Sequence, residues 1–225
     1  MINFLENNPH LLSQLVSGIK YTLIISLASA ILGILLGIII ALCKSSKLMI
    51  IKGFANIYTD LFRGTPVLLQ VSLVYFVVFG AFDLNPLIAA IVSFSLNSSA
   101  YVSEIIRSGI ENVDKGQIEA ARAMGVKEKD IILDVIIPQA IRKTLPPLIN
   151  EMATLIKESS IVYIIGVKDI MHLTDRIMSN QFLYFEPLII AGICYYLLVK
   201  IITILGQYVE VKLSYDRNKK SRKKL

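Results

Sequence analysis

Tryptophan is absent from this sequence, and cysteine and histidine occur only twice each. Cys43 and Cys194 fall in long apolar segments that should place them near opposite faces of a bilayer, so no disulfide is expected between them. His10 and His172 have no neighbours at the spacing of metal ligands. The motifs H-E-x-x-H, G-x-S-x-G and G-x-x-x-x-G-K-[ST] are also missing. We therefore expect a protein that is not an enzyme and that binds no metal, nucleotide or other cofactor by itself.

Charged residues are scarce at 18%, whereas 55% of the residues are hydrophobic and the mean hydropathy is +0.65. This composition is typical of a polytopic membrane protein, because a helix needs about 20 mostly apolar residues to span a bilayer. We predict an all-α integral membrane protein that forms one transmembrane domain over residues 1–225. Its five predicted spans lie at about 18–42, 55–82, 86–110, 146–167 and 187–211.

The distribution of positive charge predicts how these spans are oriented. The segments 44–53, 107–145 and 212–225 hold three, seven and seven of the 23 basic residues. Basic residues accumulate in cytoplasmic loops, so these segments should be cytoplasmic, with the N-terminus outside and the C-terminus inside. The basic C-terminal tail then serves as an orientation signal beside the membrane lipid, and we do not expect it to bind nucleic acid.

The longest inner segment contains a predicted helix over residues 115–124. Asp114 is placed to cap its N-terminus, and Gln117 stands where a side chain can reach back to the cap. Gly125 stands where a left-handed residue usually ends a helix. We expect prolines to break the chain after this helix, at Pro138, Pro146 and Pro147.

Five motifs in order give this chain its resemblance to a known family. They are RGTP (63–66), SSAYVSEIIRSGI (98–110), VDKGQIEAARAMG (113–125), IPQAIRKTLPPLINE (137–151) and LIKESSI (155–161). The stretch EAA-x3-G followed after nine residues by V-x-I-P resembles the cytoplasmic signature of ABC (ATP-binding cassette) importer permeases, in particular those for polar amino acids. Val135 and Ile137 depart from the usual isoleucine and leucine, and both changes are conservative.

The resemblance implies a type I importer transmembrane domain in a bacterial cytoplasmic (inner) membrane. The predicted helix would be a coupling helix that fits into a groove of a cytosolic ATP-binding subunit, which alone uses ATP. The other implied partners are a second permease, identical or not, and an extracytoplasmic amino-acid-binding protein. The residues implied in coupling are Gly116, Glu119, Ala120, Ala121 and Gly125.

Two predicted spans carry a polar stripe. In the third span the polar residues lie within about 80° around the helix axis, and in the fourth within about 120°. Because polar groups inside a membrane are costly, two such faces opposite each other would line a substrate pathway. The pathway residues are predicted to be Asn97, Tyr101, Glu104, Asn150, Glu151, Thr154 and Glu158.

The acids in this set suggest a cationic cargo, such as arginine, lysine or histidine, among the polar L-amino acids that the family resemblance implies. The alternative for Glu104 and Lys157 is a structural ion pair, for which Arg107 is well placed beside Glu104. Arg63 is expected to have a structural or gating role, and Gly33-x-x-x-Gly37 to pack closely against another helix.

A different class of protein also accounts for intramembrane Glu and Lys residues, namely an ion-coupled secondary transporter or half of one. Such proteins often contain inverted repeats. No clear internal repeat is visible in this sequence, and five spans do not divide evenly. A scaffold or channel subunit would leave both polar faces and the capped inner helix unexplained.

Overall fold

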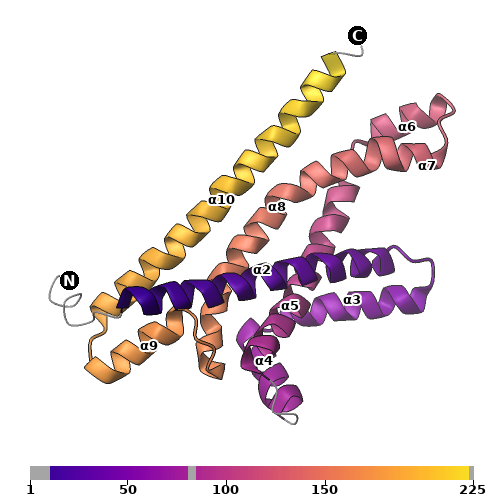
Figure 1. Ribbon diagram of the computed structural model, residues 1–225. Coiled ribbons are helices and arrows are strands. Elements are labelled where there is room, and N and C mark those ends of the chain that lie inside the picture. The colour runs from indigo at the N-terminus through magenta and orange to yellow at the C-terminus, as the bar shows by residue number, and fades with distance from the viewer. Residues whose placement is uncertain (1–10, 81–84, 223–225) are drawn as a thin grey trace.

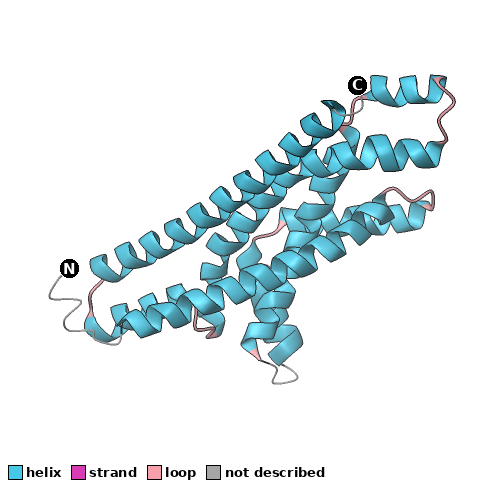
Figure 2. Ribbon diagram, turned by 45° about the horizontal axis from the view of Figure 1, so that its top comes forward, coloured by secondary structure: helices cyan, strands magenta, loops and turns pink. Residues whose placement is uncertain are grey.

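The computed structural model describes residues 11–80 and 85–222, without the side chains of residues 11, 12, 79 and 213–222. Every regular element in this part of the chain is helical (Figures 1 and 2). The start of the sequence, which includes His10, and the end of the second predicted span lie outside the described residues.

The long helices are α2 (Leu11–Lys44), α5 (Pro86–Glu111), α8 (Ile137–Glu158) and α10 (Phe185–Arg222). α2 packs along α5, and α8 packs between α5 and α10. Added Cβ atoms at Gly33 and Gly37 would lie 2.9 Å from Ser98 and 2.6 Å from Val102, both on α5. The two glycines therefore allow α2 and α5 to approach each other closely within one chain, as the G-x-x-x-G spacing predicts.

The second predicted span is broken. Helix α3 (Met49–Gly64) meets α4 (Val67–Ser72) and the π-helix η1 (Leu73–Phe79) at an angle of 106°. Pro66 lies in the break, where its missing N–H and restricted neighbour end α3. Gln70 donates its amide hydrogens to the carbonyl oxygens of Phe62 (2.8 Å) and Thr65 (3.1 Å), which the break leaves without helical partners.

Three described helical stretches are long and apolar enough to cross a membrane, or four if the bent pair counts as one span. They are Ser13–Lys44, Pro86–Glu111 and Phe185–Lys212. The predicted span 146–167 falls on the second half of α8 and the 3-10 helix η4 (Ser159–Ile165). α8 carries five charged residues along its 22 positions, namely Arg142, Lys143, Glu151, Lys157 and Glu158.

The expectation that prolines break the chain after the inner helix was wrong. Pro146 and Pro147 lie inside α8, and Pro138 stands where the π-helical turn Ile131–Ile136 continues into α8 without a break. A helix can keep internal prolines when neighbouring helices and local adjustments satisfy the freed carbonyl groups. The close packing of α8 against α5 and α10 provides such neighbours.

Helix α9 (Ile170–Gln181) lies between the fourth and fifth predicted spans, where no helix was expected. Asp169 caps it by accepting a hydrogen bond from the backbone N–H of His172 (2.8 Å), and it accepts another from the hydroxyl of Tyr195 on α10 (3.0 Å). Burial raises the pKa of the Asp169 carboxyl to about 6, even though these hydrogen bonds oppose the rise.

The apolar core lies where α2, α4, α5 and the end of α8 meet, around Phe94, Ile25 and Leu155. Figure 1 shows the start of α2 together with α9 at one end of the molecule. The helices α6 (Lys115–Ala123) and α7 (Glu128–Asp130) lie at the other end, as does the C-terminus of α10. The π-helix η3 (Ile131–Ile136) leads from α7 into α8.

Candidate functional site

The polar faces of α5 and α8 meet at a cavity of about 510 Å³, which we call the acidic cavity. Its two charged lining residues, Glu151 and Glu158, are both acidic and lie seven positions apart on α8. Their side chains are partly buried, so a positive group entering the cavity would gain more from them than from carboxylates in open water. The full lining is Asn97, Tyr101, Pro146, Pro147, Asn150, Glu151, Thr154 and Glu158.

Six of the seven predicted pathway residues therefore line one cavity. The seventh, Glu104, lies farther along α5 and lines a neighbouring cavity of about 600 Å³, which we call the inner cavity. Asn97 is only 4% exposed, and its amide group donates to Gln70 Oε1 at 2.9 Å. Asn97 thus joins the cavity wall to the break between α3 and α4.

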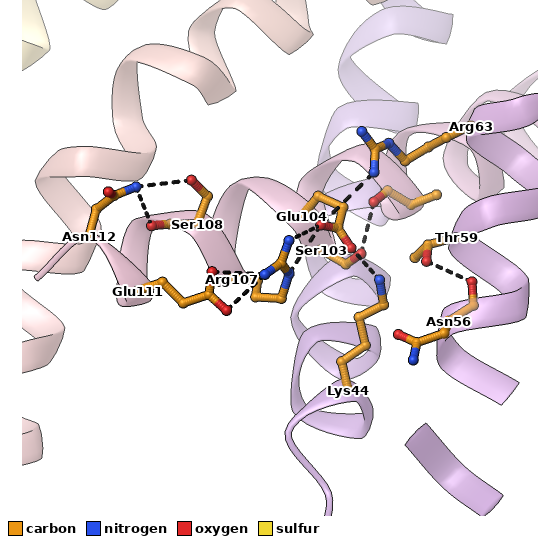
Figure 3. A network of polar contacts seen from close by, with 11 residues as sticks. Lys44, Asn56, Thr59, Arg63, Ser103, Glu104, Arg107, Ser108, Glu111 and Asn112 are labelled. Carbon is orange, nitrogen blue, oxygen red and sulfur yellow. Dashed lines mark hydrogen bonds and ion pairs between the residues drawn. The ribbon is translucent and has the colours of Figure 1, made fainter. Parts of the chain in front are cut away.

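Glu104 is the centre of an ion-pair network (Figure 3). One of its oxygens accepts from Lys44 at the end of α2, and the other lies 2.7 Å from Arg107 Nη2 and 3.9 Å from Arg63 Nη1. Arg107 also binds Glu111 at 2.7 Å. The Glu104 side chain is 17% exposed. Three cations surround the Glu104 carboxylate, which favours the alternative that Glu104 forms a structural ion pair.

The contact with Lys44 had no signal in the sequence, because the two residues are 60 positions apart. Gln70 was also missed, although one glutamine within the apolar run VLLQVSLVYF could have marked a buried polar role. Lys157, the other candidate for a structural ion pair, is exposed.

Helix α6 has the boundaries that local signals predict. Asp114 Oδ1 accepts from the Gly116 N–H at 2.9 Å, and Gly125 adopts φ of +76°. The N–H of Val126 binds the Ala121 carbonyl at 3.1 Å and the N–H of Gly125 binds that of Arg122 at 2.9 Å, which is the Schellman arrangement. The expected return of the Gln117 side chain to the cap was wrong, since Gln117 accepts from Gln139 at 2.9 Å.

No residue of α6 is buried in this chain. The predicted coupling residues Gly116, Glu119, Ala120 and Gly125 are exposed, Ala121 is half-buried, and Met124 is 82% exposed. Arg122 Nε lies 2.6 Å from Glu128 Oε1 across the following turn. This pairing lowers the pKa of Glu128 and raises that of Arg122. α6 is thus an ordered helix with a largely free surface, on which small and charged side chains are interspersed.

Residues 33–215 match the family model described as the inner membrane component of binding-protein-dependent transport systems. This chain belongs to that family. It is therefore a membrane-embedded permease subunit of an ABC importer, a type of transporter that works with ATP-binding subunits, and permeases of this family have no ATPase site of their own.

Individual relatives agree with this assignment. The chain is 46% identical over 201 residues to the arginine transport system permease protein ArtQ of Bacillus subtilis, and 41% identical over 201 residues to the putative glutamine transport system permease protein GlnP of Rickettsia typhi. Each alignment covers 88% of this permease and 92% of the relative. Among solved structures, an amino acid ABC transporter crystallised with histidines has a TM-score of 0.85 and 37% identity, covering 94% of this chain and 97% of that one.

Proposed function

We propose that this permease forms the translocation pathway for a polar L-amino acid and prefers cationic ones. The observation that carries this proposal is the acidic cavity, in which Glu151 and Glu158 are the only charged members of the lining. A carboxylate there can pair with the α-ammonium group of any amino acid, and a second carboxylate can pair with a basic side chain. The relatives named for arginine and glutamine support a polar amino acid, and the arginine permease supports the cationic preference.

The motor in this proposal is a separate ATPase that docks on α6. The exposed small residues of α6 support this role, because they allow another protein surface to come close. The proposed topology has the N-terminus outside and the C-terminus in the cytoplasm of a bacterium, with five spans if the bent pair and α8 each cross the membrane. Figure 1 supports it, since α6 and the end of α10 lie at the end of the molecule opposite α9 and the start of α2.

Two permease copies, or this chain and a paralogue, would enclose the pathway, because a single chain encloses the acidic cavity only in part. An extracytoplasmic binding protein would deliver the amino acid to the outer mouth. α6 lies between α5 and α8 in the chain. ATP binding would move α6 and with it these two helices, so the acidic cavity would open to one side of the membrane and then to the other.

Uptake by the complete transporter, reconstituted with its ATPase and binding protein, tests the cargo. In Glu151→Gln and Glu158→Gln, kcat/KM for arginine uptake should fall by about 13- to 160-fold, since a lost charged hydrogen bond costs about 1.5–3 kcal/mol. Glutamine uptake should fall less than arginine uptake in the variant that loses the partner of the basic side chain, and equally in the variant that loses the partner of the α-ammonium group. Glu210→Gln, at an exposed position on α10, is the matched control and should transport normally.

Equal losses for arginine and glutamine in both variants would contradict the cationic preference. Variants that fail to assemble with the ATPase would show instead that the two acids are structural. If neither amino acid is taken up by the unsubstituted transporter, the proposed cargo class is wrong.

A further inference from the structure

The acidic cavity and the inner cavity are neighbours that share two lining residues, Tyr101 on α5 and Pro147 on α8. These residues lie on helices that pack against each other. A solute that leaves the acidic cavity toward the inner cavity must therefore pass the Tyr101 ring and the Pro147 ring. We call this shared boundary the passage.

Arg63 lies over this passage. Its guanidinium carbon is 5.5 Å from the centroid of the Tyr101 ring, which is within the range of a cation–π interaction. Arg63 belongs to the last turn of α3, directly before the 106° break at Pro66. Its position is therefore tied to the bend in the second span, and any change in that bend moves the guanidinium relative to the ring.

Arg63 is also the most weakly held cation around Glu104. Its distance to the carboxylate is 3.9 Å, whereas Arg107 lies at 2.7 Å and Lys44 is in direct contact with the other oxygen. The Arg63 side chain is 43% exposed, but that of Lys44 is only 8% exposed. Lys44 and Arg107 thus neutralise Glu104, and Arg63 remains free to leave the ring without disrupting the network.

The charges of the two cavities are opposite. Glu151 and Glu158 make the acidic cavity negative, whereas the charged lining residues of the inner cavity are Arg63, Lys143 and the neutralised Glu104. A cation held in the acidic cavity would meet positive potential beyond Tyr101. A neutral amino acid would meet only the steric boundary.

We propose that Arg63 and Tyr101 form an inner gate that holds back cationic solutes by charge and all solutes by bulk. This proposal rests on the proposed function of the acidic cavity and assigns a specificity role to a residue outside that cavity. A change in the bend between α3 and α4 moves Arg63 away from the Tyr101 ring, and this movement opens the gate.

The test is the leak of labelled arginine and glutamine from preloaded proteoliposomes that contain the whole transporter held with ATP bound and not hydrolysed, so that the outer side is open and the inner gate is the remaining barrier. Arg63→Gln should raise the arginine leak about fivefold and the glutamine leak about twofold, because it removes both charge and bulk. Arg63→Lys keeps the charge but not the planar stacking group, so it should raise both leaks equally and modestly. Arg176→Gln, an exposed position on α9, is the charge control and should not leak.

Tyr101→Leu and Tyr101→Phe provide a second, independent pair. Leucine removes the ring and should raise both leaks, whereas phenylalanine keeps the ring face and should retain the preference for holding arginine. If Arg63→Gln does not assemble, this pair decides the outcome. The gate is refuted if Arg63→Gln and Tyr101→Leu leak at the rate of the unsubstituted transporter, or if Arg63→Gln raises both leaks equally. If the unsubstituted transporter shows no ATP-driven uptake of either amino acid, the proposed function is refuted instead.

Discussion

A substitution at Gly125 tests how the backbone conformation at the end of α6 contributes to docking of the ATPase, apart from the other features of this helix. A Cβ added at Gly125 would meet no atom within 4 Å, so alanine causes no clash in this chain. Its cost comes only from φ of +76°, a left-handed conformation that is about 1 kcal/mol less favourable for alanine than for glycine. Asparagine tolerates this region better and should cost less.

The free permease can relieve the strain by fraying the last turn of α6, since no residue of α6 is buried. A helix docked in a groove must keep that turn. Gly125→Ala should therefore weaken binding of the ATPase by about fivefold, which corresponds to about 1 kcal/mol, and reduce ATP-coupled uptake accordingly. Membrane insertion and thermal stability of the transmembrane part should remain unchanged.

The assay is titration of the purified ATPase onto the solubilised permease, followed by uptake in proteoliposomes. Gly53→Ala on α3, where an added Cβ also meets nothing within 4 Å, is the matched control. A smaller loss in Gly125→Asn than in Gly125→Ala would identify backbone conformation as the cause, whereas a larger loss would identify side-chain bulk. Unchanged affinity in both variants would refute the docking role of α6.

Two further predictions concern stability. Gly37→Ala should destabilise the solubilised protein by about 1–3 kcal/mol in a denaturant titration, since its Cβ would lie 2.6 Å from Val102, whereas Gly53→Ala should cost nothing; equal effects would contradict the close α2–α5 contact. The Asp169 carboxyl has its pKa raised to about 6, so its stabilising contribution is present at low pH and is lost as the pH rises through 6. Between pH 5 and 7.5 this loss should be about 1 kcal/mol, and it should be absent in Asp169→Asn; an identical pH profile for both proteins would refute it.

Elements whose ends are set by neighbouring residues could be predicted from the sequence. The limits of α6 depend on Asp114 and Gly125, which act through hydrogen bonds within a few positions. α9 carries a comparable local signal that was overlooked. Asp169 precedes buried residues at the helical spacing Ile170, Leu173, Thr174 and Ile177.

Features that depend on distant partners could not be predicted. Pro66 indicated a kink, but the full break is stabilised by Gln70 on α4 together with Asn97, which approaches from α5. Pro146 and Pro147 remain inside α8 because of how that helix packs, and sequence spacing does not report packing.

The candidate site also combines features set by helical spacing, which could be predicted, with features set by distant partners, which could not. Spacing on α5 and α8 identified six residues that share one cavity, because both helices are regular. Arg107, three positions after Glu104, was a visible partner, whereas Lys44 and Arg63 approach Glu104 from α2 and α3. The ion-pair network therefore emerged only from the fold.

The most direct test of the account is solute accumulation in vesicles by this permease alone and together with its ATPase and binding protein. We expect the complete assembly to concentrate labelled amino acid only when ATP is supplied, and the permease alone to accumulate none. Accumulation against a gradient by the permease alone, driven by an ion gradient, would contradict the account.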